Sequence, residues 1–341
     1  RDPRFAQVLF GDDEKIPATL DEPELRAEVE KIGKTEGGEV RQTSRILDGY
    51  GHVILRSGTG QEGRAFWLRY GRIVQHAHQD LLSIGFAAHQ RDMLPEMGYP
   101  QGWTHASQWA ANWGTHYGTH ITGVPTRGFG RGVLTLFADT APARVATATS
   151  KFGSGDSEAT RSRTIVLVDL SDRDCYAVTL ERVLGGKEHT MSFHGPDGEV
   201  AVDGLQLEDQ PQGTVLGADA AYGDFSGAAD GELSCLAFMY DARRATSKGA
   251  TSKGDTSKGD TSKEVWSLDY SLRGQENVHL LATMLTPDGS QVALAKGKPP
   301  QGNKAYEITW SIVNRQGPAP LASQFVTVLE PFEGRRIVQR I

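Results

Sequence analysis

The sequence predicts an all-β fold, a large antiparallel β-sandwich of the super-sandwich kind, and three observations carry that prediction. From about residue 44 onward the chain consists of short runs rich in β-branched and aromatic residues. Gly, Asp and Pro separate these runs at near-regular spacing, as expected for many short strands joined by turns. Glycine contributes 40 of the 341 residues, which suits a fold with many turns and bulges.

One segment near the start of the chain predicts a helix. Leu25, Val29 and Ile32 recur at helical spacing within residues 22–32, and acidic residues occupy the first turn. The short β-branched and aromatic runs typical of strands begin soon afterwards, at about residue 44. We therefore expect an N-terminal helical and linker segment at residues 1–43 and one β-sandwich domain at residues 44–341.

Several apolar runs are the clearest strand candidates, and they lie at 52–56, 65–70, 132–137, 164–168 and 324–329. Two further candidates, 238–240 and 265–268, flank a polar TSKG repeat at 246–264. The repeat cannot bury an apolar face, so we expect a flexible, lysine-bearing surface loop that interrupts the domain. Contact with an anionic polymer is its alternative role.

Charge and composition exclude several classes of partner. The net charge of -7 and the pI near 5.8 give no basic field, which argues against nucleic acid and against an anionic membrane surface. A locally basic groove can still bind an acidic polymer. No run of about 18 apolar residues is present, so we expect no membrane span. Cys175 and Cys235 are compatible with a disulfide or with two buried thiols.

Four residues point to chemistry: His76, His78, Glu96 and His120. If residues 75–80 are extended, the first two point to one face, because side chains alternate along a strand. Two imidazoles and one carboxylate are a common ligand set for zinc. The spacings, 18 positions from His78 to Glu96 and 24 from Glu96 to His120, suit neighbouring strands of one sheet and not a zinc finger. Any single His also fits an ordinary structural role.

Read together, several stretches resemble the heparinase II/III-like polysaccharide lyases. The matching stretches, in chain order, are GYGHVILRSG at 49–58, WLRYG at 67–71, HAHQD at 76–80, DMLPEMGY at 92–99, THITGV at 119–124, GGKEH at 185–189 and SFHGP at 192–196. The resemblance covers roughly residues 46–340, and the H-x-H-x-D block is its most specific part.

This resemblance implies a two-part enzyme. In that family a helical α/α toroid precedes a β-sandwich, and the substrate lies in the cleft between them. The helix at 22–32 then looks like the end of a toroid, and this chain like the sandwich half. The toroid supplies groups that neutralise the substrate carboxylate and act on the leaving group, and we find no place for them here. We expect a toroid domain or chain and an anionic polysaccharide as partners, and a bacterial periplasmic or secreted location.

The resemblance also implies a role for each of the four candidate site residues. His76 matches the family's catalytic His, while His78, Glu96 and His120 match its three zinc ligands. Zinc, or another divalent cation, is therefore expected to organise the site.

The sequence departs from the family pattern at two positions. The middle ligand is usually Asp, and Glu96 is one methylene longer. The third strand usually reads His-Asn-Thr, and here Ile121 replaces the Asn. His116 has the same parity as His120 and is an alternative ligand.

The reaction implied by the resemblance is β-elimination at a uronic-acid linkage, which leaves an unsaturated uronate end. A base removes the proton next to the carboxylate, and an acid serves the leaving oxygen. His76 can fill one of these roles, because a neutral imidazole titrates near the working pH. Tyr99, in the turn after Glu96, is the second catalytic candidate, with an ordinary amphipathic rim residue as the alternative.

A long aromatic segment, residues 103–117, is the candidate substrate platform. Trp109 and Trp113 offer rings for stacking on sugars, and His116 lies beside them in the sequence. The alternative is a loop folded over its own aromatic cluster. Arg127 is a candidate partner for a substrate carboxylate, as is Arg131, although solvated arginines are common beside glycines.

Three functions compete at this stage. The first is a polysaccharide lyase that supplies one wall of its active-site cleft. The second is a non-catalytic carbohydrate-binding or structural β-sandwich that retains a stabilising zinc site. The third, a cupin-type metal enzyme, pairs HxH with a nearby Glu, whereas Asp80 is the only nearby acid here.

Overall fold

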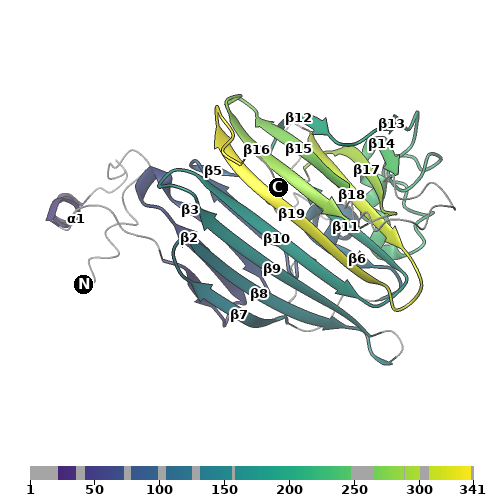
Figure 1. Cartoon of the computed structure of the whole chain (residues 1–341), viewed down its shortest axis with the longest axis horizontal. Coiled ribbons are helices and arrows are strands. Elements are labelled where there is room, and N and C mark those ends of the chain that lie inside the picture. Colours follow the sequence, from purple (N-terminus) through teal and green to yellow (C-terminus); the bar gives the residue numbers. More distant parts are fainter. Residues whose placement is uncertain are drawn as a thin grey trace, which may run out of the picture.

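The computed structural model describes residues 22–35, 43–72, 78–98, 105–124, 131–155, 158–246, 264–287, 289–299 and 307–338. Strands dominate it and form three antiparallel sheets (Figure 1), so the predicted all-β sandwich is confirmed. The predicted helix is present as α1 (Pro23–Thr35), which lies to one side of the sheets. None of the described helices has the length and apolar character needed to cross a membrane.

The largest sheet has eight strands and forms one broad layer. In spatial order its strands are β12 (Gly198–Asp203), β15 (Glu264–Leu272), β16 (Val278–Thr286), β19 (Ala322–Glu333), β10 (Cys175–Leu184), β9 (Ala159–Asp169), β8 (Ala143–Phe152) and β7 (Val133–Asp139). Burial alternates strictly along β9 and β10, which is the period-two pattern of a sheet with one covered face.

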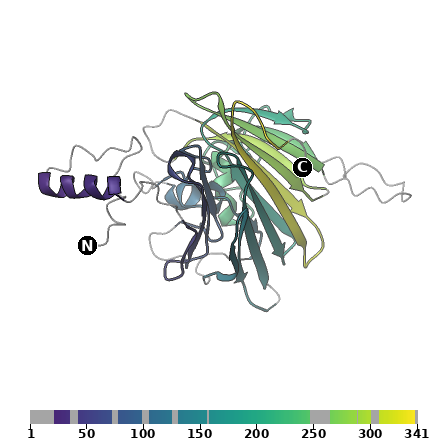
Figure 2. The ribbon, with the colours of Figure 1, turned by 60° about the vertical axis from the view of Figure 1, so that its left-hand side comes forward.

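Two smaller sheets cover the buried face of this layer. The five-stranded sheet comprises β1 (Arg45–Leu47), β2 (His52–Ser57), β3 (Arg64–Arg69), β4 (Ile84–Ala88) and β5 (Arg91–Asp92). The six-stranded sheet has the order β13 (Glu208–Asp209), β14 (Tyr240–Thr246), β17 (Gln291–Gly297), β18 (Ile308–Gln316), β11 (Glu188–His194) and β6 (Thr119–Ile121). Figure 2 shows the purple five-stranded sheet as a separate layer beside the teal-to-yellow large sheet.

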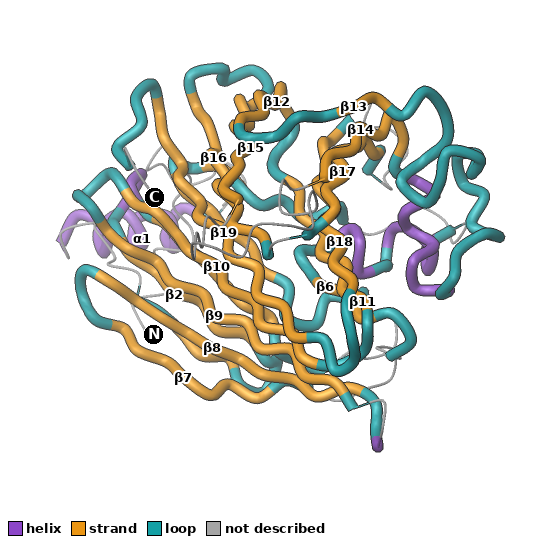
Figure 3. The backbone as a smooth tube through the Cα atoms, turned by 45° about the vertical axis from the view of Figure 1, so that its right-hand side comes forward, coloured by secondary structure: helices purple, strands orange, loops and turns teal. Residues whose placement is uncertain are grey.

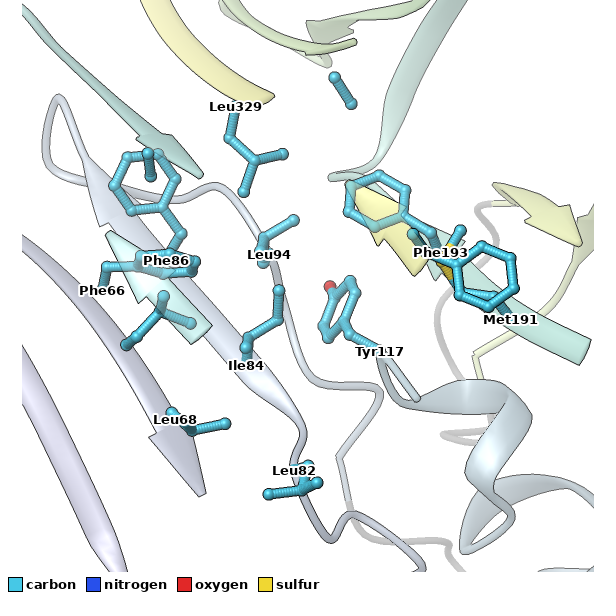
Figure 4. Close-up of a cluster of buried hydrophobic side chains, with 14 of the residues drawn as sticks. Phe66, Leu68, Leu82, Ile84, Phe86, Leu94, Tyr117, Met191, Phe193 and Leu329 are labelled. Carbon is cyan, nitrogen blue, oxygen red and sulfur yellow. The ribbon is translucent and has the colours of Figure 1, made fainter. Parts of the chain in front are cut away.

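One continuous apolar core joins the three sheets. It combines Phe66 and Phe86 of the five-stranded sheet, Leu167 and Leu329 of the large sheet, and Phe193 of the six-stranded sheet. Figure 4 shows Phe66 and Phe86 on one side of this core and Phe193 on the other, with Tyr117 between them. The core explains why burial alternates along β9 and β10, since only one side of that sheet is covered.

A second apolar cluster covers the other face of the six-stranded sheet. The π-helical turn Ala106–Ala110 and the 3-10 helices Trp113–Thr115 and Gly231–Phe238 supply it, together with β17 and β18. Figure 3 shows these helical turns (purple) next to β11 and β18. The six-stranded sheet is therefore buried on both faces, and its loops carry the candidate site.

The predicted strands agree with the structure with one exception. The five clearest runs overlap β2, β3, β7, β9 and β19, with Tyr70 and Gly132 just outside β3 and β7, and 265–268 falls in β15. The prediction of a strand at 238–240 is wrong in part, because Phe238 ends a 3-10 helix capped by Asp230 and β14 begins at Tyr240. Residues 247–263, which make up nearly all of the TSKG repeat, lie outside the described residues. Cys175 and Cys235 are both buried free thiols.

A buried arginine ties the five-stranded sheet to the large one. The guanidinium of Arg64 donates to the carboxylate of Asp169 and the hydroxyl of Ser57, each at 2.9 Å. It also donates to the carbonyl oxygens of Ser171 and Asp172, each at 2.9 Å. Every contact except that to Ser57 crosses between the two layers.

We expect Arg64→Ala to lower the free energy of unfolding by about 2–3 kcal/mol, because it leaves a partly buried carboxylate and two carbonyls without their donor. Arg144 still pairs with Asp169 at 2.7 Å, which limits the loss. Urea unfolding measures the effect. Arg173→Ala, which removes an exposed pair with Glu333, is the matched control and should change little. Equal effects from both variants would contradict the interpretation.

Candidate functional site

Three side chains that can ligate a metal meet in the structure, and we refer to His78, Glu96 and His116 as the His–Glu–His cluster. One ligand atom from each lies within 4.8 Å of the other two. His116 Nδ1 is 2.7 Å from Glu96 Oε2, and the two imidazole centroids are 5.0 Å apart. Within the described part of the chain, no other group of three His, Cys, Asp or Glu side chains comes this close.

Loops and turns carry the cluster, which differs from the predicted arrangement on neighbouring strands of one sheet. His78 lies in an irregular segment, Glu96 lies in the loop after β5, and His116 directly follows the 3-10 helix Trp113–Thr115. That helix is tightened by Asn112, whose side chain accepts a hydrogen bond from the Gly114 amide. A turn of this kind can aim one side chain without a strand register, so strand spacing was the wrong guide.

Short contacts fix the segment that follows His78 and reach Glu96 itself. Asp80, two positions after His78, pairs with Arg69 of β3 at 2.9 Å, and the Gln79 amide donates to the Ala111 carbonyl at 2.9 Å. Ser83 contributes a weaker contact, 3.5 Å from its hydroxyl to the carboxylate of Glu96.

Tyr117 links the segment that carries His116 to the loop that carries Glu96. Its hydroxyl donates to the carbonyl of Pro95 at 3.0 Å, and its ring is buried. In Figure 4 it stands between Ile84 and Leu94 on one side and Phe193 on the other. Because Tyr117 follows His116 and Pro95 precedes Glu96, one hydrogen bond sets the distance between the two ligand-bearing loops.

Charge and burial act in opposite directions on the cluster. Burial would lower the pKa of His116, but Glu96, through its charge and its hydrogen bond, raises that pKa above the ordinary value. Desolvation would raise the pKa of Glu96, and the charge of His116 outweighs this and lowers it. Burial and then the charge of His116 lower the pKa of His78. The neutral imidazole of His78 is the form that binds a metal.

The donor set fits a divalent cation. His116 is only 1 % exposed, and its Nε2 has no hydrogen-bond partner among the described residues, which is uncommon for a buried polar atom. Glu96 is 43 % exposed, so the cluster opens toward the surface on that side. Two imidazoles and one carboxylate are a donor set that zinc accepts.

The structure places His120, the third predicted ligand, apart from the His–Glu–His cluster. Its Nε2 lies 3.1 Å from Asp230 and its Nδ1 lies 3.3 Å from Glu232, and its ring stacks on Trp113. The structure therefore does not bring His120 to His78 and Glu96, and His116, the alternative at the same parity, lies there instead. Asp230 and Glu232 are more than a hundred positions away from His120 in the sequence, so no local sequence pattern could show that they pair with its imidazole.

Asp230 and Glu232 bind His120 most strongly when it is protonated. Burial would lower the pKa of His120, but the hydrogen bond to Asp230 and the neighbouring carboxylate of Glu232 raise it above 6.5. The hydrogen bond to His120 lowers the pKa of Asp230 below 3.8. The contribution of His120 is thus complete below about pH 6.5 and is lost as the pH rises through its folded-state pKa. The contribution of Asp230 to stability is lost only in strong acid, because its pKa is lowered.

We therefore expect the unfolding free energy of the wild type to fall as the pH rises above about 6.5 and through the folded-state pKa of His120, and His120→Gln to lack this component. Urea unfolding at several pH values measures it. His279→Gln, which alters a partly exposed His paired with Asp269, serves as the control. Parallel profiles for the wild type and His120→Gln would show that His120 is not charged in the folded protein.

The predicted sugar platform is not accessible. Trp109 and Trp113 are 5 % and 3 % exposed. Trp109 stacks on Phe238 and donates to the Lys298 carbonyl at 2.8 Å, while Trp113 donates to the Glu232 carbonyl at 2.7 Å. The 3-10 helix Gly231–Phe238 covers them, so the substrate-binding prediction for both is corrected to the alternative, a segment packed on its own aromatic cluster.

Three predicted site residues, His76, Tyr99 and Arg127, lie outside the described residues. Their roles remain predictions. His116, predicted to bind substrate, belongs instead to the His–Glu–His cluster. Arg131, the second arginine considered for substrate binding, pairs with Asp48 at 2.7 Å on the surface.

Comparison with known proteins places this geometry in context. Neither a protein-family model nor a curated protein sequence matches the chain. Among solved structures, heparan sulfate lyase HepC from Pedobacter heparinus aligns over 99 % of this chain and 43 % of its own length, with a TM-score of 0.59 and 12 % identity. The heparinase III BT4657 gene product aligns over 89 % of this chain and 39 % of its own length, with a TM-score of 0.57 and 12 % identity.

The chain has the fold of part of a heparinase III-type lyase. The recognition made from the sequence is thereby supported at the level of the fold. The chain spans only about two fifths of the length of these heparinase III-type structures. At this level of identity the likeness concerns the architecture, and the chemistry has to be argued from the residues of this chain.

Proposed function

We propose that this chain forms the β-sandwich wall of a polysaccharide lyase that cleaves uronic-acid-containing glycans by β-elimination. The observation that carries the proposal is the His–Glu–His cluster, open at Glu96, on a heparinase III-type fold. A metal-ligand set placed in loops at the edge of a sandwich suits a cleft better than a structural core.

In this proposal His78, Glu96 and His116 hold zinc or another divalent cation. When bound, the cation would fix three loop side chains relative to one another and add positive charge at the cleft wall. The buried Nε2 of His116, which has no hydrogen-bond partner in the described part of the chain, supports this assignment.

The candidate catalytic groups stand next to these ligands in the sequence. His76 precedes His78 by two positions, and Tyr99 follows Glu96 by three. Consecutive Cα atoms are about 3.8 Å apart, so fixing His78 and Glu96 restricts both candidates to the neighbourhood of the cluster. Imidazole and phenol are groups that can exchange protons with a bound sugar.

The elimination needs two proton transfers and one broken bond. A base, His76 or Tyr99, takes the proton from the carbon next to the uronate carboxylate, and that electron pair forms the new carbon–carbon double bond. The glycosidic oxygen leaves from the adjacent carbon and takes a proton from the other group. Negative charge develops on the carboxylate, and a toroid domain or chain is proposed to neutralise it. A periplasmic or secreted location is part of the proposal.

The test uses the chain in the longest form that its coding sequence specifies, loaded with zinc. It is incubated with heparan sulfate, chondroitin sulfate, alginate and hyaluronan, and the ultraviolet absorbance of an unsaturated uronate is followed. We expect absorbance to rise with at least one polymer and His76→Ala to abolish the rise. No absorbance from any of them, with zinc bound and the fold intact, would contradict the lyase proposal.

A non-catalytic β-sandwich with a stabilising zinc site is the second candidate. The burial of Trp109 and Trp113 favours it, because the expected aromatic sugar platform is closed. In that case zinc would raise the unfolding temperature while no polymer yields a product. The lyase proposal instead predicts that zinc is required for product formation.

A further inference from the structure

An open groove of about 690 Å³ lies on the outer face of the eight-stranded sheet. This is the face that neither smaller sheet covers. Residues at the meeting ends of β9, β10, β16 and β19 form its floor, and Arg315 of β18 lines it as well. A volume of several hundred Å³ is typical of small-ligand sites in proteins.

Strand register sets the pattern of the groove floor. Ser162, Arg182 and Gln324 lie directly opposite one another across β9, β10 and β19. Val326 lies two residues after Gln324 on β19, and it is opposite Leu285 of β16. These two residues form an apolar row beside the polar one. Because side chains alternate, these rows share the outer face. The floor therefore offers a polar row with one cation beside an apolar row.

The groove differs from the rest of the protein in its charge. None of the described residues that line it is acidic, and two are arginines. Arg182 is exposed and has no ion pair or hydrogen bond with a described residue. Arg315 donates to the Ala322 carbonyl and, at 3.2 Å, to the Ser323 hydroxyl, but pairs with no described carboxylate.

The buried arginines among the described residues, by contrast, face carboxylates, as Arg64, Arg144 and Arg161 do. In a protein of net charge -7, two arginines in an acid-free groove form a local exception. Guanidinium groups bind carboxylate and sulfate groups with paired, charge-assisted hydrogen bonds. The charge pattern favours an anionic ligand.

The groove is separated from the His–Glu–His cluster by the sheet itself. Arg163 lies one position after Ser162 on β9, and its side chain points to the opposite, inner face. There it donates to the carbonyls of Leu82, at 2.7 Å, and Tyr117, which adjoins His116. A ligand in the groove would thus lie across the sheet from the cluster.

We propose that this groove binds an acidic oligosaccharide at a site separate from the catalytic cleft. Arg182 and Arg315 each contact a carboxylate or sulfate group. Leu285 and Val326 pack against the apolar face of a sugar ring, and Ser162 and Gln324 bind its hydroxyl groups. The choice of a sugar as the anion rests on the proposed function, while the preference for an anion rests on the groove alone.

The test measures binding without catalysis. Zinc-free protein carrying His76→Ala is titrated with a size-defined heparan sulfate oligosaccharide in a calorimeter, alone and with Arg182→Ala, Arg315→Ala or both. We expect a loss of about tenfold for each variant and about 100-fold for the pair, the usual scale of one charge-assisted contact each. Arg182→Glu should weaken binding further. Arg273→Ala, which removes an exposed arginine outside the groove, should bind as wild type.

Two results would overturn the proposal. One is wild-type affinity in the double variant, and the other is equal affinity for a neutral oligosaccharide of the same length. Since Arg182 is exposed, Arg182→Ala should fold normally, and urea unfolding checks this. Failure of the lyase assay with binding intact would contradict the proposed reaction alone, and failure of binding with lyase activity intact would contradict the groove alone.

Discussion

Replacing Glu181 with alanine should lower the free energy of unfolding by about 3–5 kcal/mol, the cost of breaking a buried ion pair from one side. Glu181 of β10 is 1 % exposed, and it lies between Arg161 and Arg163 of the neighbouring strand β9. One carboxylate oxygen is 2.8 Å from Arg161, and the other accepts from Arg163 and, at 2.7 Å, from Thr119. Removal leaves two buried cations without a counter-charge.

The effect should also reach the site, because Arg163 holds the carbonyls of Leu82 and Tyr117. Urea unfolding near neutral pH gives the stability change, with Glu158→Ala as the matched control. Glu158 forms an exposed pair with Lys151, and its loss should cost less than about 1 kcal/mol. A similarly small loss for Glu181→Ala would mean that the network is hydrated and does not hold the layers together.

Substituting His116 by alanine should reduce zinc affinity by about 100-fold or more, since even the residues that support metal ligands change affinity by about 10–100-fold. His78→Ala and Glu96→Ala should have effects of the same order. Each removes one of the three donors that lie within 4.8 Å of one another. Competition with a chromophoric chelator measures the dissociation constants.

His120→Gln is the matched control for this series, because His120 is a buried histidine that pairs with Asp230 and Glu232 and does not belong to the cluster. It should retain zinc affinity close to that of the wild type. If His120→Gln lost zinc while His116→Ala retained it, the ligand set read from the sequence would be right and the one read from the structure would be wrong.

The fold was predictable from the sequence because its signals are local. The short apolar, β-branched runs at 164–168 and 324–329 lie within strands β9 and β19, and the helix at 22–32 shows the 3.6-residue period. The 3-10 helix at Gly231–Phe238 was missed, since its apolar residues read equally well as a strand. Its cap, Asp230, was the available signal.

The site was only partly predictable. His78 and Glu96 were found by residue type and resemblance, and the structure brings them together. The exchange of His116 for His120 depends on a tight turn and on two carboxylates distant in the sequence, neither of which spacing can show. The same distance hid the burial of Trp109, whose cover comes from Phe238 and Trp310.

The central claim is that the His–Glu–His cluster is a metal centre, and locating the metal tests it most directly. Crystals of the wild-type protein grown with zinc would be measured at the zinc absorption edge. We predict one strong anomalous peak within bonding distance, about 2.0–2.2 Å, of His78, Glu96 and His116. A peak at His120, or a fully ordered but metal-free cluster in zinc-saturated crystals, would contradict the account.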